Sequence, residues 1–260
     1  MNRLVSVAAL LGAVLLVSCE KNAVQALPEE PLPGAQIKFF NFGLNAPAVN
    51  FYAGETKMTA VFTTDTIESV TGVAYGSVGN GGLYLGLAPG TYTLTGRIAA
   101  ATDKNLAIDT ISATLADGGS YSFYLSGSYD ATAKNVDAFI VEDPLAASWD
   151  YAAASVRFVN ALYNAKPMTL YLKNTDTTVT KDSIPVGGEV AYKAAGPFTA
   201  VPNGVYNLIT RYTGSNTSII SRTNVSFVLG HMYTIAARGD TTVKSSTATN
   251  RPFLDNTANR

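Results

Sequence analysis

Residues capable of nucleophilic or metal chemistry are scarce in this chain. It has one cysteine, Cys19, and one histidine, His231. A zinc site needs three or four His, Cys or carboxylate ligands, so the sequence predicts no assembled metal site. A Ser-His-Asp triad would depend on His231, which follows a glycine in a turn-like segment, and no nucleophile-elbow motif is present. We therefore expect His231 to be a solvated turn residue, and we predict no catalytic residue, no metal and no cofactor.

A pair of carboxylates is the remaining catalytic arrangement, because a glycosidase needs only two acids on either side of a cleft. The acids outside obvious turns are Glu55, Glu68, Glu142, Asp143 and Glu189. None of them falls in a recognisable motif. Glu142 and Asp143 precede Pro144, which favours an exposed position at the end of a domain over a place in a site.

The position of Cys19 suggests a role for it that is not catalytic. Met1–Arg3 carries one basic residue, and an uncharged apolar block, Leu4–Val17, follows it. This layout is typical of a secretory signal, and the block is shorter than the about 20 apolar residues of a membrane-spanning helix. The block ends in the sequence LVSC, which resembles the lipobox of bacterial lipoproteins. We predict a signal peptide over 1–18 and lipidation of Cys19; the alternative is a plain signal peptide in which the cysteine is incidental.

A lipidated Cys19 would anchor the mature chain to a membrane, since each buried methylene contributes about 0.8 kcal/mol. Glu20 stands where an aspartate commonly retains lipoproteins in an inner membrane, so we expect the outer membrane and leave the face open. Residues 19–34 are rich in proline and are predicted to form a flexible tether. The chain has a net charge of −1, which argues against a nucleic-acid binder because such a protein needs a basic face.

The pattern after residue 34 is β throughout. Short runs rich in β-branched and aromatic residues alternate with clusters of Gly, Asn, Asp and Pro. In Thr91–Ile98, for example, apolar residues alternate with threonines, as in a strand with one buried face. No window of ten or more residues has convincing helical periodicity. Turn signals at intervals of about 8–12 residues predict sandwiches of two sheets. Strands are expected at 37–42, 48–53, 92–98, 121–125 and 138–141.

The second half of the chain repeats the first. Ile37–Asn41 aligns with Val156–Asn160, and the register continues without a gap to Tyr52 over Tyr171. Further matched pairs are Tyr92 with Tyr206, Arg97 with Arg211, Gly118 with Gly230, Tyr121 with Tyr233, and Gly127 with Gly239. We predict a tandem duplication of a β domain of about 110 residues. The predicted domains are 35–145 and 155–260, joined by a linker at 146–154, and the last ~15 residues are expected to form a polar tail.

Three segments, IKFFNFGLNAPAVNFYAG, LAPGTYTLTGR and LADGGSYSFYLSG, resemble the domain-of-unknown-function 4397 (DUF4397) family. They are similar to its opening strand pair, its "pAGtYtl" strand and its later "Gk.YTv" strand. The second half keeps this frame more loosely. The resemblance implies two tandem immunoglobulin-like or transthyretin-like β-sandwich domains without an established enzyme activity, in a secreted or lipid-anchored bacterial protein. A histidine that often follows the first strand is replaced here by Phe42 and Ala161, so no role of that imidazole is carried over.

Aromatic side chains are the candidates for ligand contact, because they can stack on sugar rings. Tyr121 and Tyr233 occupy matching positions and are expected in the cores. The candidates for exposed contact residues are Tyr124, Tyr129, Trp149 and Tyr151. A second interpretation, which we favour, makes Trp149 and Tyr151 part of a plug between the two domains.

Five Asp-Thr or Asp-Ser pairs resemble the short acceptor for O-glycosylation of exported Bacteroidota proteins. The acceptor candidates are Thr66, Thr110, Thr177, Ser183 and Thr241. A simpler explanation is that threonine-rich strand edges follow turn aspartates. We hypothesise that some of these hydroxyls are modified.

Together these observations predict a non-catalytic, lipid-anchored protein of the cell envelope, either a glycan- or protein-binding module or a structural one. The expected partners are the membrane and a glycan or envelope protein, with no nucleic acid, and the oligomeric state is left open. The alternative is an envelope polysaccharide hydrolase that uses a carboxylate pair.

Overall fold

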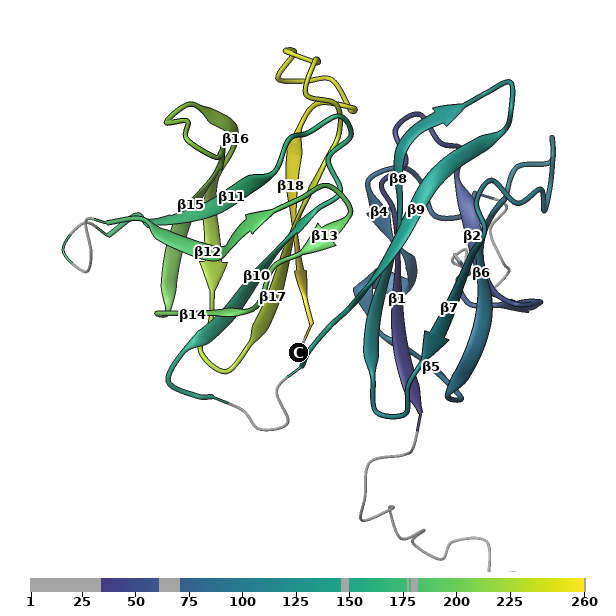
Figure 1. Cartoon of the computed structure of the whole chain (residues 1–260), viewed down its shortest axis with the longest axis horizontal. Coiled ribbons are helices and arrows are strands. Elements are labelled where there is room, and N and C mark those ends of the chain that lie inside the picture. The colour runs from purple at the N-terminus through teal and green to yellow at the C-terminus, as the bar shows by residue number, and fades with distance from the viewer. Residues whose placement is uncertain (1–33, 61–70, 146–149, 177, 179–181, 260) are drawn as a thin grey trace, which may run out of the picture. The chain divides into compact units, whose positions relative to one another are not determined.

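The computed structural model describes residues 34–60, 71–145, 150–176, 178 and 182–259 (Figure 1). Residues Gly34–Arg260 form one compact unit. The described residues are all-β: their only helical turn is the short 3-10 segment Gly79–Gly82. No helix in this part of the chain is long and apolar enough to cross a bilayer. The predicted all-β fold with two sandwich-like groups of sheets is confirmed.

The first group, which we call the N-terminal sandwich, consists of two sheets. Its strands are β1 (Ala35–Asn41), β2 (Val49–Ala53), β3 (Thr56–Lys57), β4 (Ser77–Val78), β5 (Leu85–Leu87), β6 (Gly90–Ile98), β7 (Ile111–Leu115), β8 (Ser120–Asp130) and β9 (Asn135–Glu142). One sheet has the order β4-β1-β8-β9, with β5 also paired to β1, and the other has the order β3-β2-β6-β7.

The second group, the C-terminal sandwich, has the same topology. Its strands are β10 (Ala154–Asn160), β11 (Met168–Asn174), β12 (Ile184–Val190), β13 (Ala194–Ala195), β14 (Thr199–Val201), β15 (Gly204–Tyr212), β16 (Ser218–Phe227), β17 (Met232–Arg238) and β18 (Phe253–Ala258). Its sheets have the orders β13-β10-β17-β18, with β14 also paired to β10, and β12-β11-β15-β16.

A parallel pair of strands stands at the centre of one sheet in each sandwich. β1 runs parallel to β8 with Ile37 opposite Tyr121, and β10 runs parallel to β17 with Val156 opposite Tyr233. The sequence alignment of the two halves matched Ile37 with Val156 and Tyr121 with Tyr233, so the matched residues form equivalent cross-strand pairs. The two sandwiches therefore agree in register as well as in strand order.

Each sandwich encloses its own apolar core between its two sheets. Phe39, Phe51 and Phe123 form the aromatic centre of the N-terminal core, with Phe39 and Phe51 stacked at 5.1 Å between ring centroids. Tyr206 and Phe227 lie in the C-terminal core. Tyr121 and Tyr233 are each 9% exposed and belong to these clusters, so the prediction that they are core residues is confirmed. Burial of this apolar surface is the main force that holds each pair of sheets together.

The tyrosine at the start of β6 and of β15 makes the same hydrogen bond in both sandwiches. The Tyr92 hydroxyl donates to the carbonyl of Ala88, and the Tyr206 hydroxyl donates to that of Pro202, each at 2.9 Å. Both bonds reach back four residues, so each fixes the turn that leads into its strand. The Pro-Gly and Pro-Asn-Gly sequences before the strands supply those turns.

Two sequence predictions about the later chain need correction. The polar tail is wrong, because Phe253–Ala258 form β18 and Leu254 is fully buried in the C-terminal core. Its polar residues misled the prediction because they serve as partners: the Asp255 carboxylate accepts a 2.6 Å bond from Arg238. The predicted linker also ends one residue too late, because Ala154 is the fully buried first residue of β10.

Removing the Tyr206 hydroxyl should weaken the fold. Tyr206→Phe leaves the carbonyl of Pro202 without its donor next to a fully buried ring, and we expect the free energy of unfolding to fall by about 1 kcal/mol. The matched control is Tyr92→Phe, whose hydrogen bond is exposed and competes with water, so its effect should be smaller. Urea unfolding of the two variants measures the difference; an equal or larger loss for Tyr92→Phe would contradict this account.

Candidate functional site

The exposed aromatic candidates do not gather in one site. Tyr124 was predicted to be exposed, and this is wrong: it is fully buried and stacks between Phe40 and Phe139, with ring centroids at 4.4 and 5.0 Å. Tyr129 is partly buried against the N-terminal core. Tyr151 is 73% exposed, which does not suit a plug between sandwiches. Trp149 lies outside the described residues, as do Cys19 and Glu68.

The candidate O-glycosylation residues differ in the exposure of their hydroxyl groups. Thr110 is exposed, and Ser183 is half-buried. The Thr241 hydroxyl already donates a 2.5 Å hydrogen bond to Oδ1 of Asn164, so a sugar there would have to displace it. Thr66 and Thr177 lie outside the described residues.

The acidic residues considered for a hydrolase mechanism have different environments. The exposed Glu55 carboxylate takes two hydrogen bonds from Arg97, at 2.8 and 2.9 Å, and these hold its pKa below the ordinary value. A carboxylate held ionised in this way is a poor general acid. Glu142 and Glu189 are exposed, whereas Asp143 is not the exposed residue that the sequence suggested. Within the described residues, no cluster of three or more His, Cys, Asp and Glu side chains could hold a metal ion.

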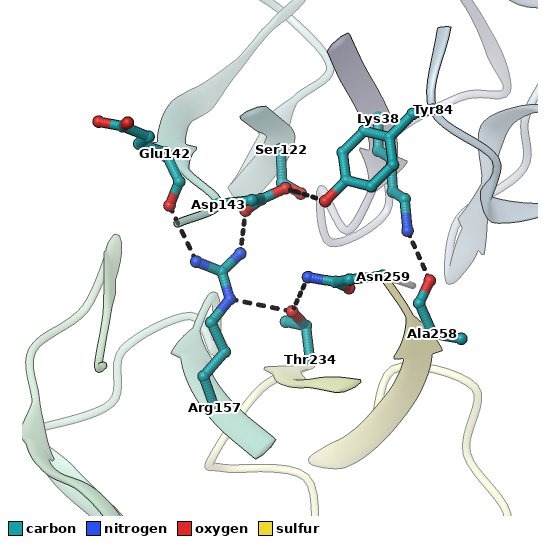
Figure 2. A network of polar contacts seen from close by, with 9 residues as sticks. All are labelled: Lys38, Tyr84, Ser122, Glu142, Asp143, Arg157, Thr234, Ala258 and Asn259. Atoms are coloured by element: carbon teal, nitrogen blue, oxygen red, sulfur yellow. Dashed lines mark hydrogen bonds and ion pairs between the residues drawn. The ribbon is translucent and has the colours of Figure 1, made fainter. Parts of the chain in front are cut away.

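Asp143 instead forms a buried ion pair with Arg157 between the two sandwiches (Figure 2). Asp143 directly follows β9, and Arg157 lies in β10; both side chains are at most 1% exposed. The Asp143 carboxylate also accepts hydrogen bonds from Ser122 at 2.7 Å and Tyr84 at 2.6 Å. The Arg157 guanidinium donates further to the carbonyl of Glu142 and the Thr234 hydroxyl, both at 2.9 Å. Each charge therefore has several partners, as burial requires.

Lys38 occupies the position in β1 that Arg157 occupies in β10. In the parallel ladders, Lys38 lies opposite Ser122 and Arg157 lies opposite Thr234. The Lys38 amine donates a 2.6 Å hydrogen bond to the carbonyl of Ala258 at the end of β18, just as Arg157 reaches the carbonyl at the end of β9. Lys38 is 2% exposed, and burial lowers its pKa to about 8. Each sandwich thus contributes one cationic side chain that donates a hydrogen bond to the carbonyl at the end of the last strand of the other sandwich.

An apolar cluster continues the contact beside this polar network. Phe40, Phe42, Tyr124 and Phe139 of the N-terminal sandwich pack with Val159, Ala161 and Ala236 of the C-terminal one. We call this cluster, together with the network of Figure 2, the seam. The charged groups of the seam are buried and hydrogen-bonded, so we interpret the seam as an element of stability. The sequence showed Lys38 and Arg157 aligned, but gave no sign that both side chains would be buried.

One loop that differs in length between the two sandwiches precedes the last strand of each. In the N-terminal sandwich only residues 131–134 connect β8 to β9, whereas residues 239–252 connect β17 to β18. This longer segment is held in place by its own polar contacts: the Asp240 carboxylate accepts from the backbone N–H of Thr242 at 2.8 Å and from Asn164 at 3.0 Å. Asp240 also donates its backbone N–H to the carbonyl of Asn250 at 3.0 Å.

A cavity of about 740 Å³ lies between this segment and the start of β16. Its volume is within the usual range for a small-molecule site. The residues that line it are Tyr212, Thr217, Ser218, Ile219, Ile220, Ser221, Thr241, Val243, Lys244, Ser245, Ser246, Arg251, Pro252 and Phe253. Half of them carry a hydroxyl, two are cationic, and the two aromatic ones, Tyr212 and Phe253, offer ring surface. Such a lining can hydrogen-bond and stack on a polyhydroxylated ligand.

Comparison with known proteins identifies the first part of the chain. The family described as "Domain of unknown function (DUF4397)" matches residues 35–171. The chain belongs to this family. The DUF4397 match covers the whole N-terminal sandwich and continues through the first part of β11, so it includes both Asp143 and Arg157. The cavity lies entirely beyond the DUF4397 match.

Other comparisons add little to the DUF4397 assignment. No curated protein matches the chain. Among solved structures, the crystal structure of wild-type pneumolysin is similar with a TM-score of 0.23 and 12% identity, over 70% of this chain. The chain spans only 32% of that protein.

Breaking the buried ion pair should be costly. Asp143→Asn leaves the Arg157 guanidinium buried without a counter-charge, and we expect the free energy of unfolding to fall by about 3–5 kcal/mol. The double variant Asp143→Asn/Arg157→Met removes both charges and should recover most of that loss. Urea unfolding followed by tyrosine fluorescence measures both. A loss below about 1 kcal/mol for Asp143→Asn would show that the pair is not buried as described.

Proposed function

We propose that this protein is a non-catalytic, lipid-anchored binding module of the bacterial cell envelope, and that the cavity of the C-terminal sandwich binds a glycan. The observation that carries the proposal is the placement of the cavity. It is lined by residues of the 239–252 segment, which is longer than the corresponding connection of the N-terminal sandwich, residues 131–134. Function is commonly added to a repeated scaffold in such loops.

The lining of the cavity favours a sugar over a purely apolar ligand. Hydroxyl groups of Ser218, Ser221 and Ser246 can exchange hydrogen bonds with sugar hydroxyls, and the rings of Tyr212 and Phe253 offer stacking surface. The segment is ordered by its own hydrogen bonds, so its residues need little rearrangement to bind.

The two sandwiches are proposed to be tandem copies of one domain. Their strand orders, the register of their parallel strands and their tyrosine hydrogen bonds agree. Arg97 lies over the Tyr52 ring at 4.3 Å, and Arg211 lies over the Tyr171 ring at 5.2 Å, which is a further matched contact. A duplication leaves one copy free to acquire a site while the other keeps the scaffold.

The anchor is proposed from the sequence around Cys19, with the outer membrane as the destination. Cys19→Ser removes the thiol that takes the lipid, so the variant should move from the membrane fraction to the soluble fraction or remain as an unprocessed precursor. Labelling cells with an alkyne analogue of palmitate measures lipidation directly, and the wild-type protein should carry the label. Equal labelling of the wild type and the variant would contradict lipidation at this residue.

A bulky residue placed in the cavity should abolish glycan binding. Ser246 is exposed at the cavity, and Ser246→Trp should fill it without disturbing a core, lowering affinity at least about tenfold. Binding is measured by calorimetry against oligosaccharides selected from an array of bacterial and plant glycans.

The matched control for this experiment is Ser112→Trp, which places the same ring on the exposed face of β7 in the N-terminal sandwich. Its binding should equal that of the wild type. If no glycan binds the wild type, or if both variants bind as it does, the cavity is not a glycan site.

A further inference from the structure

The charged residues that line the cavity are all positive. Lys244 and Arg251 line it, and none of its lining residues is acidic. Neither cation forms an ion pair with a residue that the structure describes. The whole chain has a net charge of −1, so this positive lining is a local feature and does not follow from the composition.

More positive charge lies directly behind the lining. The guanidinium groups of Arg222, Arg238 and Arg251 surround the Phe253 ring, with their carbons 5.4, 5.1 and 5.2 Å from its centroid. The nearby carboxylates compensate this charge only in part. Asp255 pairs with Arg238 at 2.6 Å. Asp240 accepts hydrogen bonds from Thr242 and Asn164, which hold its pKa below the ordinary value, with a smaller contribution from Lys244. Among these groups near Phe253 and the 239–252 segment, four side chains are cationic and two are carboxylates.

Both lining cations keep donors free for a ligand. The Lys244 amine uses one hydrogen bond, of 2.9 Å, to the carbonyl of Thr241. Arg251 uses one N–H, at 2.9 Å, to the carbonyl of Ala248. An ammonium group has three donors and a guanidinium group has five, so acceptors in the described part of the chain take up only a minority of them. Hydrogen bonds between such groups and an anion are about twice as strong as neutral ones.

We infer that the cavity takes an acidic saccharide, whose carboxylate, sulfate or phosphate group is bound by Lys244 and Arg251. This inference rests on the proposed function, because it names the ligand class of the same cavity. The aromatic rings and hydroxyls contact the sugar, while the two cations select its negative charge. Binding of a saccharide removes water from the Lys244 and Arg251 cations. An acidic saccharide compensates this loss with its own negative charge, whereas a neutral sugar does not, so the cavity favours the acidic one.

The test compares oligosaccharides of one length that differ only in charge. The probes are a neutral galacto-oligosaccharide, the corresponding oligogalacturonide and a sulfated galacto-oligosaccharide, each titrated into the full mature chain by calorimetry. We expect at least one acidic probe to bind about tenfold or more tightly than the neutral one, and its affinity to fall several-fold between 50 and 500 mM NaCl because salt screens the attraction. The better acidic probe identifies the anion.

Charge-removing variants locate the effect. Lys244→Gln and Arg251→Gln should each weaken the acidic probe about tenfold and change the neutral one less than twofold. Lys173→Gln removes an exposed lysine of β11 that does not line the cavity, and it should bind as the wild type. Thermal unfolding of each variant separates loss of binding from loss of fold, which matters because Arg251 also packs on Phe253.

The outcomes distinguish this inference from the proposed function. Equal, salt-insensitive binding of neutral and acidic probes would overturn the acidic ligand and leave glycan binding intact. If both glutamine variants bind the acidic probe as the wild type does, the inference is also overturned, because other residues would then bind the anionic group. Absence of binding by both acidic probes would overturn the acidic ligand, whereas the proposed function is overturned only if no glycan of the array binds the wild type.

Discussion

The burial of charged groups at the seam is the constraint on which the arrangement of the two sandwiches depends. Removing the charges of Asp143 and Arg157 from water costs several kcal/mol each unless their hydrogen bonds are replaced. The apolar contacts of the seam are non-directional and would tolerate small rotations. The hydrogen bonds of Arg157 and Asp143 depend on direction, so they favour the arrangement in which these donors and acceptors meet.

The seam and the cavity share a strand. β18 begins at Phe253, which lines the cavity, and ends at Ala258, whose carbonyl accepts from Lys38 of the N-terminal sandwich. Arg238 adds a second connection, because its guanidinium lies over Phe253 and over Phe42 and Tyr75 of the N-terminal sandwich. The cavity therefore rests on a strand that is fixed at both ends. A site supported in this way keeps its geometry better than one built on loops alone.

Sequence reasoning recovered the strands because they leave local signals. Glycines, prolines and paired tyrosines mark strand ends whatever surrounds them. It placed Tyr124 wrongly because the alternation of a strand tells which residues share a face, but not whether that face is covered. β8 lies in a sheet that has its core on one side and the seam on the other, so both faces are buried.

Asp143 and β18 were misjudged for a related reason: their polar residues find partners far away in the chain, which spacing alone does not reveal. The cavity is formed by a segment without periodicity, and its hollow depends on how that segment packs against β16.

The place of β1 determines how the molecule would bear a load. β1 begins directly after Gly34, and it is a central strand, paired with β8 over residues 36–41 and with β4 and β5 on its other side. If the chain before Gly34 holds the protein to a membrane, as proposed, a pull along the axis of β1 stresses all these hydrogen bonds in shear at the same time. An edge strand pulled across its axis would instead open one bond after another. An envelope protein attached through this strand would resist extraction by flow or by a moving ligand with the combined strength of its whole central sheet.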